Sequence, residues 1–214
     1  MAAPLQAGPE ASGAESDVRT ILIETAVDCL ASRGYRGTTV EGVAHAAGWT
    51  KGAVYWHFRD KDALVASAID FLAARWLAGL RDHLDQLDRA RERLDRLFDN
   101  FLRLALHERP VCIGLHALTI ELRQHPVHAA PLRLILETTA RLVHEIITGG
   151  QAEGTMRPDV DARTVAHSIV GSLGGALVTC SYGADGVGFG PLVRSLKQTY
   201  GGALLSAPLP RSMR

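Results

Sequence analysis

The sequence has few cysteines, no net charge and no long uninterrupted apolar segment. Its three cysteines, Cys29, Cys112 and Cys180, are odd in number and far apart, so they predict neither a disulfide framework nor a metal site of the CxxC type. The formal net charge is zero. The whole chain therefore gives no electrostatic sign of a nucleic-acid partner, and such a partner can be argued only from a local patch.

Targeting and membrane segments are also lacking. The best apolar candidate, residues 168–180, is shorter than the about 18 residues that a membrane-spanning helix needs. Residues 1–15 are rich in Ala, Gly, Pro and Glu and do not show the basic and apolar segments of a signal peptide. These observations predict disordered tails at residues 1–16 and 207–214, and a cytoplasmic protein with no membrane partner.

Strand-like alternation is scarce, whereas apolar residues recur at three- and four-residue spacing along most of the chain. This pattern predicts an all-α fold of about nine helices. Capping residues and Pro- or Gly-rich breaks place these helices at about residues 17–33, 38–48, 51–58, 61–87, 89–108, 110–124, 131–149, 161–182 and 190–205.

Two short segments carry the start signals of a helix-turn-helix. Thr38 and Glu41 have the spacing of a capping box, which predicts the start of the first of these helices. After a glycine turn, Thr50 can cap the second helix, in which Val54 and Phe58 share one face. Two short helices joined by a tight glycine turn form a helix-turn-helix.

The segment TTVEGVAHAAGWTKGAVYWHFRDK, residues 38–61, resembles the TetR family of bacterial repressors, and the match continues through Leu64. The resemblance implies a DNA-binding domain at residues 17–62 and a ligand-binding and dimerisation domain at residues 63–206. It further implies a homodimeric repressor that a small-molecule effector releases from a palindromic double-stranded DNA operator.

The exposed face predicted for the second short helix suits DNA. Small residues at its start allow the backbone to approach base edges in the major groove, while hydroxyl and basic side chains can bind phosphate. By resemblance, residues 51–53 contact bases, Trp56 contacts either bases or backbone, and Tyr55, His57 and Lys61 contact the DNA backbone. The predicted DNA-binding residues are Thr39, Thr50, Lys51, Gly52, Ala53, Tyr55, Trp56, His57 and Lys61.

Structural alternatives exist for three of these residues. Tyr55 and Trp56 could instead be core aromatics, and His57 could bind a backbone carbonyl. Glu41 stands where members of the family can carry a basic residue, and helix capping is the role expected for it.

The second domain has no comparable motif. On the helix after Pro110, Cys112, His116, Thr119 and Arg123 share a face that either lines a pocket or meets solvent. Because small-molecule sites are mostly apolar with a few placed polar groups, we expect an effector pocket here, with core and surface as the alternative. The predicted ligand-binding residues are Trp76, Phe98, Phe101, His116 and Thr119.

No metal, cofactor or catalytic activity is expected. Histidines, Cys112 and Glu121 crowd residues 107–128, but only Cys112 and His116 have same-face helical spacing. The sequence contains no nucleophile elbow, phosphate loop or zincin spacing. The alternatives to a ligand-released repressor are a metal-responsive or ligand-independent regulator, and an enzyme or carrier that shares only the helical bundle.

The last two predicted helices carry apolar stripes that a monomer would expose. Paired across a two-fold axis, they would form a four-helix bundle. The predicted dimer-interface residues are Ile169, Leu173, Gly174, Leu177, Leu192, Leu196 and Tyr200.

Overall fold

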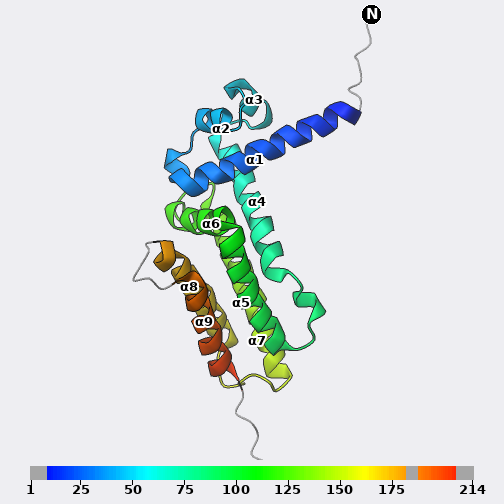
Figure 1. Cartoon of the computed structure of the whole chain (residues 1–214), viewed down its shortest axis with the longest axis vertical. Helices are drawn as coiled ribbons and strands as arrows, with labels where there is room; N and C mark the ends of the chain where they lie inside the picture. The colour runs from blue at the N-terminus through cyan, green and yellow to red at the C-terminus, as the bar shows by residue number, and fades with distance from the viewer. Residues whose placement is uncertain (1–8, 182–187, 206–214) are drawn as a thin grey trace, which may run out of the picture.

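The computed structural model describes residues 9–181 and 188–205, and these residues form an all-α fold, as predicted (Figure 1). The only bridge between extended residues in this part of the chain joins Met156 and Leu205. The α-helices are α1 Pro9–Gly37, α2 Val40–Ala46, α3 Lys51–His57, α4 Lys61–Arg81, α5 Ala90–His107, α6 Arg109–Glu121, α7 Ala129–Ala152, α8 Ala162–Ser181 and α9 Phe189–Leu204, with a short 3₁₀ turn, η1 Leu84–Gln86, after α4.

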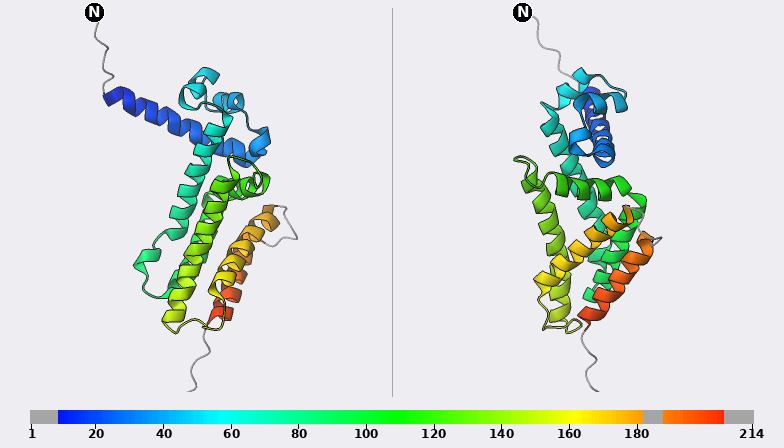
Figure 2. Two further views of the ribbon diagram at one scale, coloured as in Figure 1. Left: turned by 180° about the vertical axis from the view of Figure 1, so that it is seen from behind. Right: turned by 90° about the vertical axis from the view of Figure 1, so that its left-hand side faces the viewer.

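The helices form two regions that α4 connects. Helices α1, α2 and α3 occupy one end of the molecule, and α5 to α9 form a bundle at the other (Figures 1 and 2). Each region has its own cluster of buried apolar side chains, one around α1 to α4 and α6, the other around α5 and α7 to α9. Trp76 on α4 packs against both clusters, so its side chain lies where the two regions meet.

The helix-turn-helix begins one residue later than predicted. Thr39, not Thr38, caps α2, because its hydroxyl oxygen accepts a hydrogen bond from Gly42 N at 3.0 Å. Gly34 turns the chain with a positive φ of 68°, which places Thr38 on the inside of the turn, where its hydroxyl donates to Gly34 O at 2.8 Å. Thr50 caps α3 as predicted, accepting from Ala53 N at 3.2 Å.

Two other helix ends differ from the sequence prediction. Helix α1 begins at Pro9, so residues 9–16 of the predicted tail are helical. Proline suits the first turn of a helix, where its missing N–H is not needed, and several alanines and glutamates follow it. Residues 1–8 and the predicted C-terminal tail at 207–214 lie outside the described residues.

Helix α4 stops at Arg81, several residues before the predicted end near residue 87. The reason is a left-handed residue, His83, with φ of 58°. The amide nitrogen of buried Asn100 donates to Leu80 O at 3.0 Å and to Asp82 O at 2.8 Å, so carbonyls released at the helix end find partners in α5.

One segment, Lys61–Gln86, is long and apolar enough to cross a membrane by length and composition. It differs from the candidate considered in the sequence, residues 168–180. In the structure this segment contains α4, which packs against α1, α5 and α6 and buries Leu64, Leu72 and Leu80. The apolar residues of this segment therefore belong to the two buried clusters of the fold.

Candidate DNA-binding surface and ligand pocket

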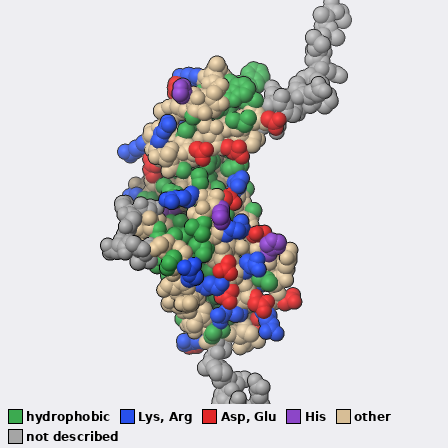
Figure 3. Space-filling view, viewed as in Figure 1, with side chains coloured by type: hydrophobic (Ala, Val, Ile, Leu, Met, Phe, Trp, Pro, Cys, Tyr) green, Lys and Arg blue, Asp and Glu red, His purple; other side chains and the backbone are tan. Residues whose placement is uncertain are grey.

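Helix α3 presents one face to the core and the other to solvent. Val54 and Phe58 are buried, as predicted, and fix the helix on α1 and α2. Trp56 is 77% exposed and Tyr55 45% exposed, which rules out the alternative that both are core aromatics. Gly52 at the start of the helix is exposed and adds no side chain to this face. Figure 3 shows hydrophobic side chains at the surface of this end of the molecule.

Lys51 is held by the neighbouring helix. Its ammonium forms an ion pair with Glu41 of α2 and lies 5.6 Å from the centre of the Tyr55 ring. The hydrogen bond from Lys51 is the main cause that lowers the pKa of the Glu41 carboxyl. Glu41 therefore orients Lys51 rather than completing the predicted capping box with Thr38, and binding of Lys51 to a base would require it to leave Glu41.

Lys61 stabilises the last turn of α1, which follows the non-helical Gly34. Its Nζ donates to Tyr35 O at 2.6 Å and lies 4.0 Å from the centre of the Tyr35 ring. Burial of this ammonium lowers the pKa of Lys61. The phosphate contact expected of Lys61 stays a prediction, and it would have to use N–H groups other than the one that binds Tyr35.

Thr39 and Thr50 lie at the ends of α2 and α3 that meet the exposed face. Each hydroxyl oxygen accepts a backbone N–H, so each hydroxyl hydrogen can still be donated outward. His57 is half-buried, and its ring centre lies 6.4 Å from that of Phe58. Ala53 is half-buried between these residues. The structure thus gathers the predicted DNA-binding residues around one surface, except Lys61, whose ammonium is turned to Tyr35.

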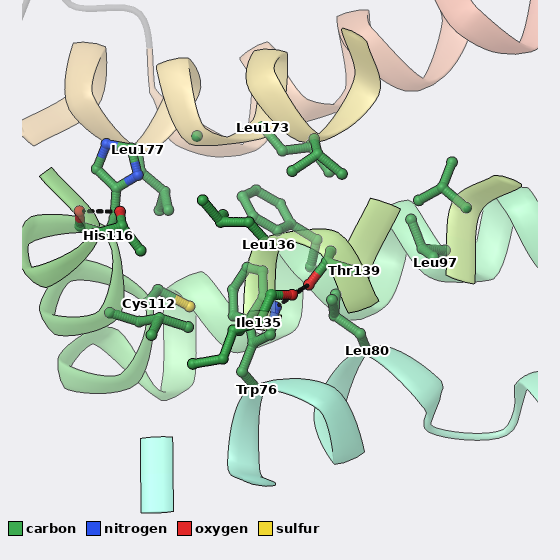
Figure 4. A pocket seen from close by; sticks show the side chains of 16 residues that line it. Trp76, Leu80, Leu97, Cys112, His116, Ile135, Leu136, Thr139, Leu173 and Leu177 are labelled. Atoms are coloured by element: carbon green, nitrogen blue, oxygen red, sulfur yellow. Dashed lines mark hydrogen bonds between the residues drawn. The ribbon is translucent and has the colours of Figure 1, made fainter. Parts of the chain in front are cut away.

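A mostly apolar cavity of about 50 Å³ lies between α4, α5, α6, α7 and α8 (Figure 4). Four of the five predicted ligand-binding residues line it: Trp76, Phe101, His116 and Thr119. Because one water-sized sphere needs about 10–15 Å³, the cavity as it stands accommodates a few water molecules or one small apolar group. A larger ligand therefore requires the lining side chains to move.

The fifth predicted ligand residue, Phe98, does not line the pocket. It is buried and stacks on Tyr200 of α9, with ring centres 6.4 Å apart. Leu97 and Phe101, four residues apart on α5, both face the pocket. Phe98 directly follows Leu97, so its side chain is rotated by about 100° around the helix axis and faces α9. The predicted role of Phe98 in ligand binding therefore has no support from the lining of this cavity.

The remaining lining residues are not among the predicted ligand-binding residues. Most are aliphatic side chains that a core would also use, so nothing in the sequence distinguishes them from core positions. They are Leu80, Leu97, Cys112, Leu115, Ile135, Leu136, Thr139, Val143, Val170, Leu173, Gly174 and Leu177. The shared face of Cys112, His116 and Thr119 was the available signal, and the structure turns this face into the pocket while Arg123 is exposed.

His116 supplies the free polar atom of the pocket. Thr139 Oγ1 accepts from Trp76 Nε1 at 3.0 Å and donates to Ile135 O at 2.9 Å, and Thr119 Oγ1 donates to His116 O at 2.7 Å. In contrast, His116 Nε2 is buried and has no hydrogen-bond partner within the described part of the chain. A ligand with one polar group would find its partner here.

The family model described as bacterial regulatory proteins, tetR family, matches residues 22–68, from the middle of α1 to the first turns of α4. The helix-turn-helix region of the chain therefore matches the TetR family. The match covers the helix-turn-helix and its surface residues, so the exposed face of α3 corresponds to the part of the chain that defines this family.

Two curated relatives and a solved structure extend this comparison. The HTH-type transcriptional repressor KstR2 of Mycobacterium tuberculosis is 28% identical over 162 residues, 74% of this chain and 78% of the repressor. The HTH-type transcriptional regulator TtgR of Pseudomonas putida is 35% identical over 81 residues, so the match spans 38% of this chain and only 36% of TtgR. A crystal structure of a TetR transcriptional regulator from Chloroflexus aurantiacus is 22% identical in sequence and superposes with a TM-score of 0.79. The superposition spans 91% of this chain and 100% of the Chloroflexus protein, which shows a shared fold.

The predicted dimer stripe of this protein points inward. Ile169, Leu173 and Leu177 are buried within the protomer, and Leu173, Gly174 and Leu177 line the pocket. A Cβ on Gly174 would lie 3.2 Å from the His116 ring. These α8 residues cannot also form a surface between protomers, because covering α7 and the pocket already uses them.

The predicted α9 residues are half-buried in the same way. Leu196 and Tyr200 pack against the bundle core, and the Tyr200 hydroxyl is hydrogen-bonded to Ser172 of α8 at 2.8 Å. Leu192 is half-buried at the start of the helix. The exposed residues of the two helices include many small ones: Ser168, Gly171, Gly175 and Thr179 on α8, and Ser195, Thr199, Gly202 and Ala203 on α9. Larger exposed residues on the same helices are Arg163, His167, Val178, Arg194 and Gln198.

We expect the partly buried His116 to make the free energy of unfolding depend on pH. Burial lowers the pKa of His116 below its ordinary value of 6.5. The unfolded chain therefore binds a proton that the folded chain excludes, and the free energy of unfolding falls as the pH drops from about 6.5 toward the folded pKa.

We predict that His116→Gln flattens this dependence in urea unfolding measured between about pH 5 and 7. The exposed His107, replaced in the same way, should leave the profile unchanged, and an unaltered slope in His116→Gln would contradict the assignment.

Proposed function

We propose that this protein is a cytoplasmic, homodimeric TetR-family repressor that binds a palindromic operator through α3 and is released by a small, mostly apolar effector. The observation that carries the proposal is the solvent-exposed face of α3, where Trp56 is 77% exposed. Trp49 and Tyr55 are also exposed, and a group of large exposed apolar side chains is typical of an interaction surface, whereas a single one is not.

The geometry of α3 suits insertion into the major groove. Exposed Gly52 removes bulk at the N-terminal end of the helix, where recognition helices contact base edges. Lys51 is placed to bind a guanine once it leaves Glu41, and Trp56 can contact a thymine methyl group or the sugar-phosphate backbone. Thr39 and Thr50 offer hydroxyl groups to phosphates on either side.

The outward faces of α8 and α9 are the proposed dimer interface. Their small residues allow two helix pairs to approach closely across a two-fold axis. A Cβ atom added to Gly171, Gly175 or Gly202 would meet no other atom within 4 Å, so this face has open space for a partner. On α8 this face lies about half a turn from the stripe predicted from sequence, because successive residues are about 100° apart around a helix.

The pocket sets the chemistry of the proposed effector. Its lining is apolar apart from a few groups, and His116 Nε2 is available for one hydrogen bond. We therefore propose an apolar molecule that carries a single hydroxyl, carbonyl or carboxylate group. Because Trp76 lines the pocket and contacts both cores, an effector that displaces its ring would shift α4 and change the spacing of the two α3 helices in the dimer.

The α3 surface gives a direct test of DNA binding. We predict that Gly52→Leu keeps the fold but weakens operator binding by at least about 10- to 100-fold, since a side chain of this size blocks approach to the bases. Fluorescence anisotropy on labelled operator measures the affinity, and circular dichroism the fold. Gly52→Ala is the matched control with a smaller loss, because a Cβ there meets only Thr50 Oγ1 at 3.8 Å. Full affinity of folded Gly52→Leu would exclude this surface.

The proposed dimer interface on the outward faces of α8 and α9 gives a second test. We predict that Gly175→Arg yields a monomer in analytical ultracentrifugation and loses operator affinity by orders of magnitude, because a dimer gains its second half-site intramolecularly. The control is Gly149→Arg on α7, another helical glycine whose Cβ position has no atoms within 4 Å. A Gly175→Arg protein that remains dimeric would place the interface on another surface.

A further inference from the structure

Three side chains from distant parts of the sequence meet where the DNA-binding end joins the bundle. Asp62 is the second residue of α4, and His125 and His128 lie in the connection between α6 and α7. One ligand atom from each lies within 4.8 Å of the other two. The three residues belong neither to the α3 surface nor to the lining of the α4–α8 pocket.

The contacts among them are close. His128 Nε2 lies 3.1 Å from Asp62 Oδ1, and the His125 and His128 rings stack with their centres 4.6 Å apart. The His128 side chain is 1% exposed and Asp62 is 40% exposed, so the cluster reaches from the interior to the surface. His128 Nε2 is therefore the ring nitrogen that faces the cluster, and it is the ligand atom that this residue offers.

We propose that Asp62, His125 and His128 bind a zinc-type divalent transition-metal ion at this junction. Two imidazoles and one carboxylate, with a fourth position open to water, are a donor set that Zn²⁺ uses, whereas Mg²⁺ and Ca²⁺ favour oxygen ligands.

The distances fit with a small adjustment. Zn²⁺ holds these ligands at about 2.0–2.2 Å in a tetrahedron, so its ligand atoms lie roughly 3.4 Å from one another. The His128 and Asp62 pair, at 3.1 Å, is already near that separation. The ligand atom of His125 would have to move closer to the other two. His125 is half-exposed and lies in the connection between α6 and α7, which allows this movement.

A metal ion here would join the two regions of the molecule. The Tyr35 hydroxyl, from the last turn of α1, donates to Asp62 Oδ1 at 2.8 Å. The Tyr35 ring lies edge-on to His125 and His128, at 5.1 and 5.8 Å between ring centres. The ion would therefore fix the connection between α6 and α7 on the first turn of α4 and beside the start of the helix-turn-helix.

Zinc titration of the full-length, tag-free protein tests this proposal. The protein, stripped with a chelator, competes with a chromogenic chelator for Zn²⁺. We expect one equivalent per chain, and His125→Ala should weaken the affinity at least about tenfold, as ligand-shell changes do. The control is His107→Ala, an exposed histidine on α5 that should bind as the native chain does. Equal binding by native and His125→Ala proteins would overturn the proposal and leave only the hydrogen bond between Asp62 and His128.

Substitution with Co²⁺ gives a second readout that does not depend on stability. The native protein should show the visible absorption bands of tetrahedral cobalt, and His125→Ala should lose them, while an excess of Mg²⁺ should not abolish the bands of the native protein. Because His128 is buried, His128→Gln is used only after circular dichroism shows that it folds. Neither measurement involves DNA, so the result is independent of the proposed repressor activity.

Discussion

Helix α4 has to bury apolar side chains in two cores at once, and the position of the DNA-binding end follows from that constraint. Its first half supplies Leu64, Val65 and Leu72 to the core that holds α1, α2 and α3, and its second half supplies Leu80 to the bundle. Trp76 lies where the two cores meet and also lines the pocket. Because burying a side chain of this kind contributes about 1.5–3 kcal/mol, neither region can release α4 without a substantial cost. This shared helix is the route by which the proposed effector would act on the DNA-binding end.

The sequence predicted the DNA-binding end well because its signals are local. A capping threonine at Thr50 and the pair Val54 and Phe58, four residues apart, define α3 and its buried face without reference to the rest of the chain. The error at the start of α2 has a non-local cause. Thr38 and Thr39 are equally good capping residues, and the left-handed conformation of Gly34 decides between them.

The bundle was predicted less well because one apolar stripe can cover either a core or a partner. Helix α8 carries Ile169, Leu173 and Leu177 at regular spacing, and spacing alone cannot say which surface they meet. Packing against α7 and α9 decides it, and Gly171 and Gly175 then fall on the outer face. The histidine cluster shows the same limit. His125 and His128 meet Asp62 across more than sixty residues, through the packing of α6 on α1 and α4.

The proposed repressor is a dimer that places two α3 helices on one face of DNA. Selection of the purified protein's preferred sites from a random double-stranded pool tests this most directly. A two-fold dimer should enrich an inverted repeat whose half-site centres lie about 10–10.5 base pairs, or a multiple of that spacing, apart. Enrichment of a single unrepeated site, or of no sequence at all, would contradict this arrangement.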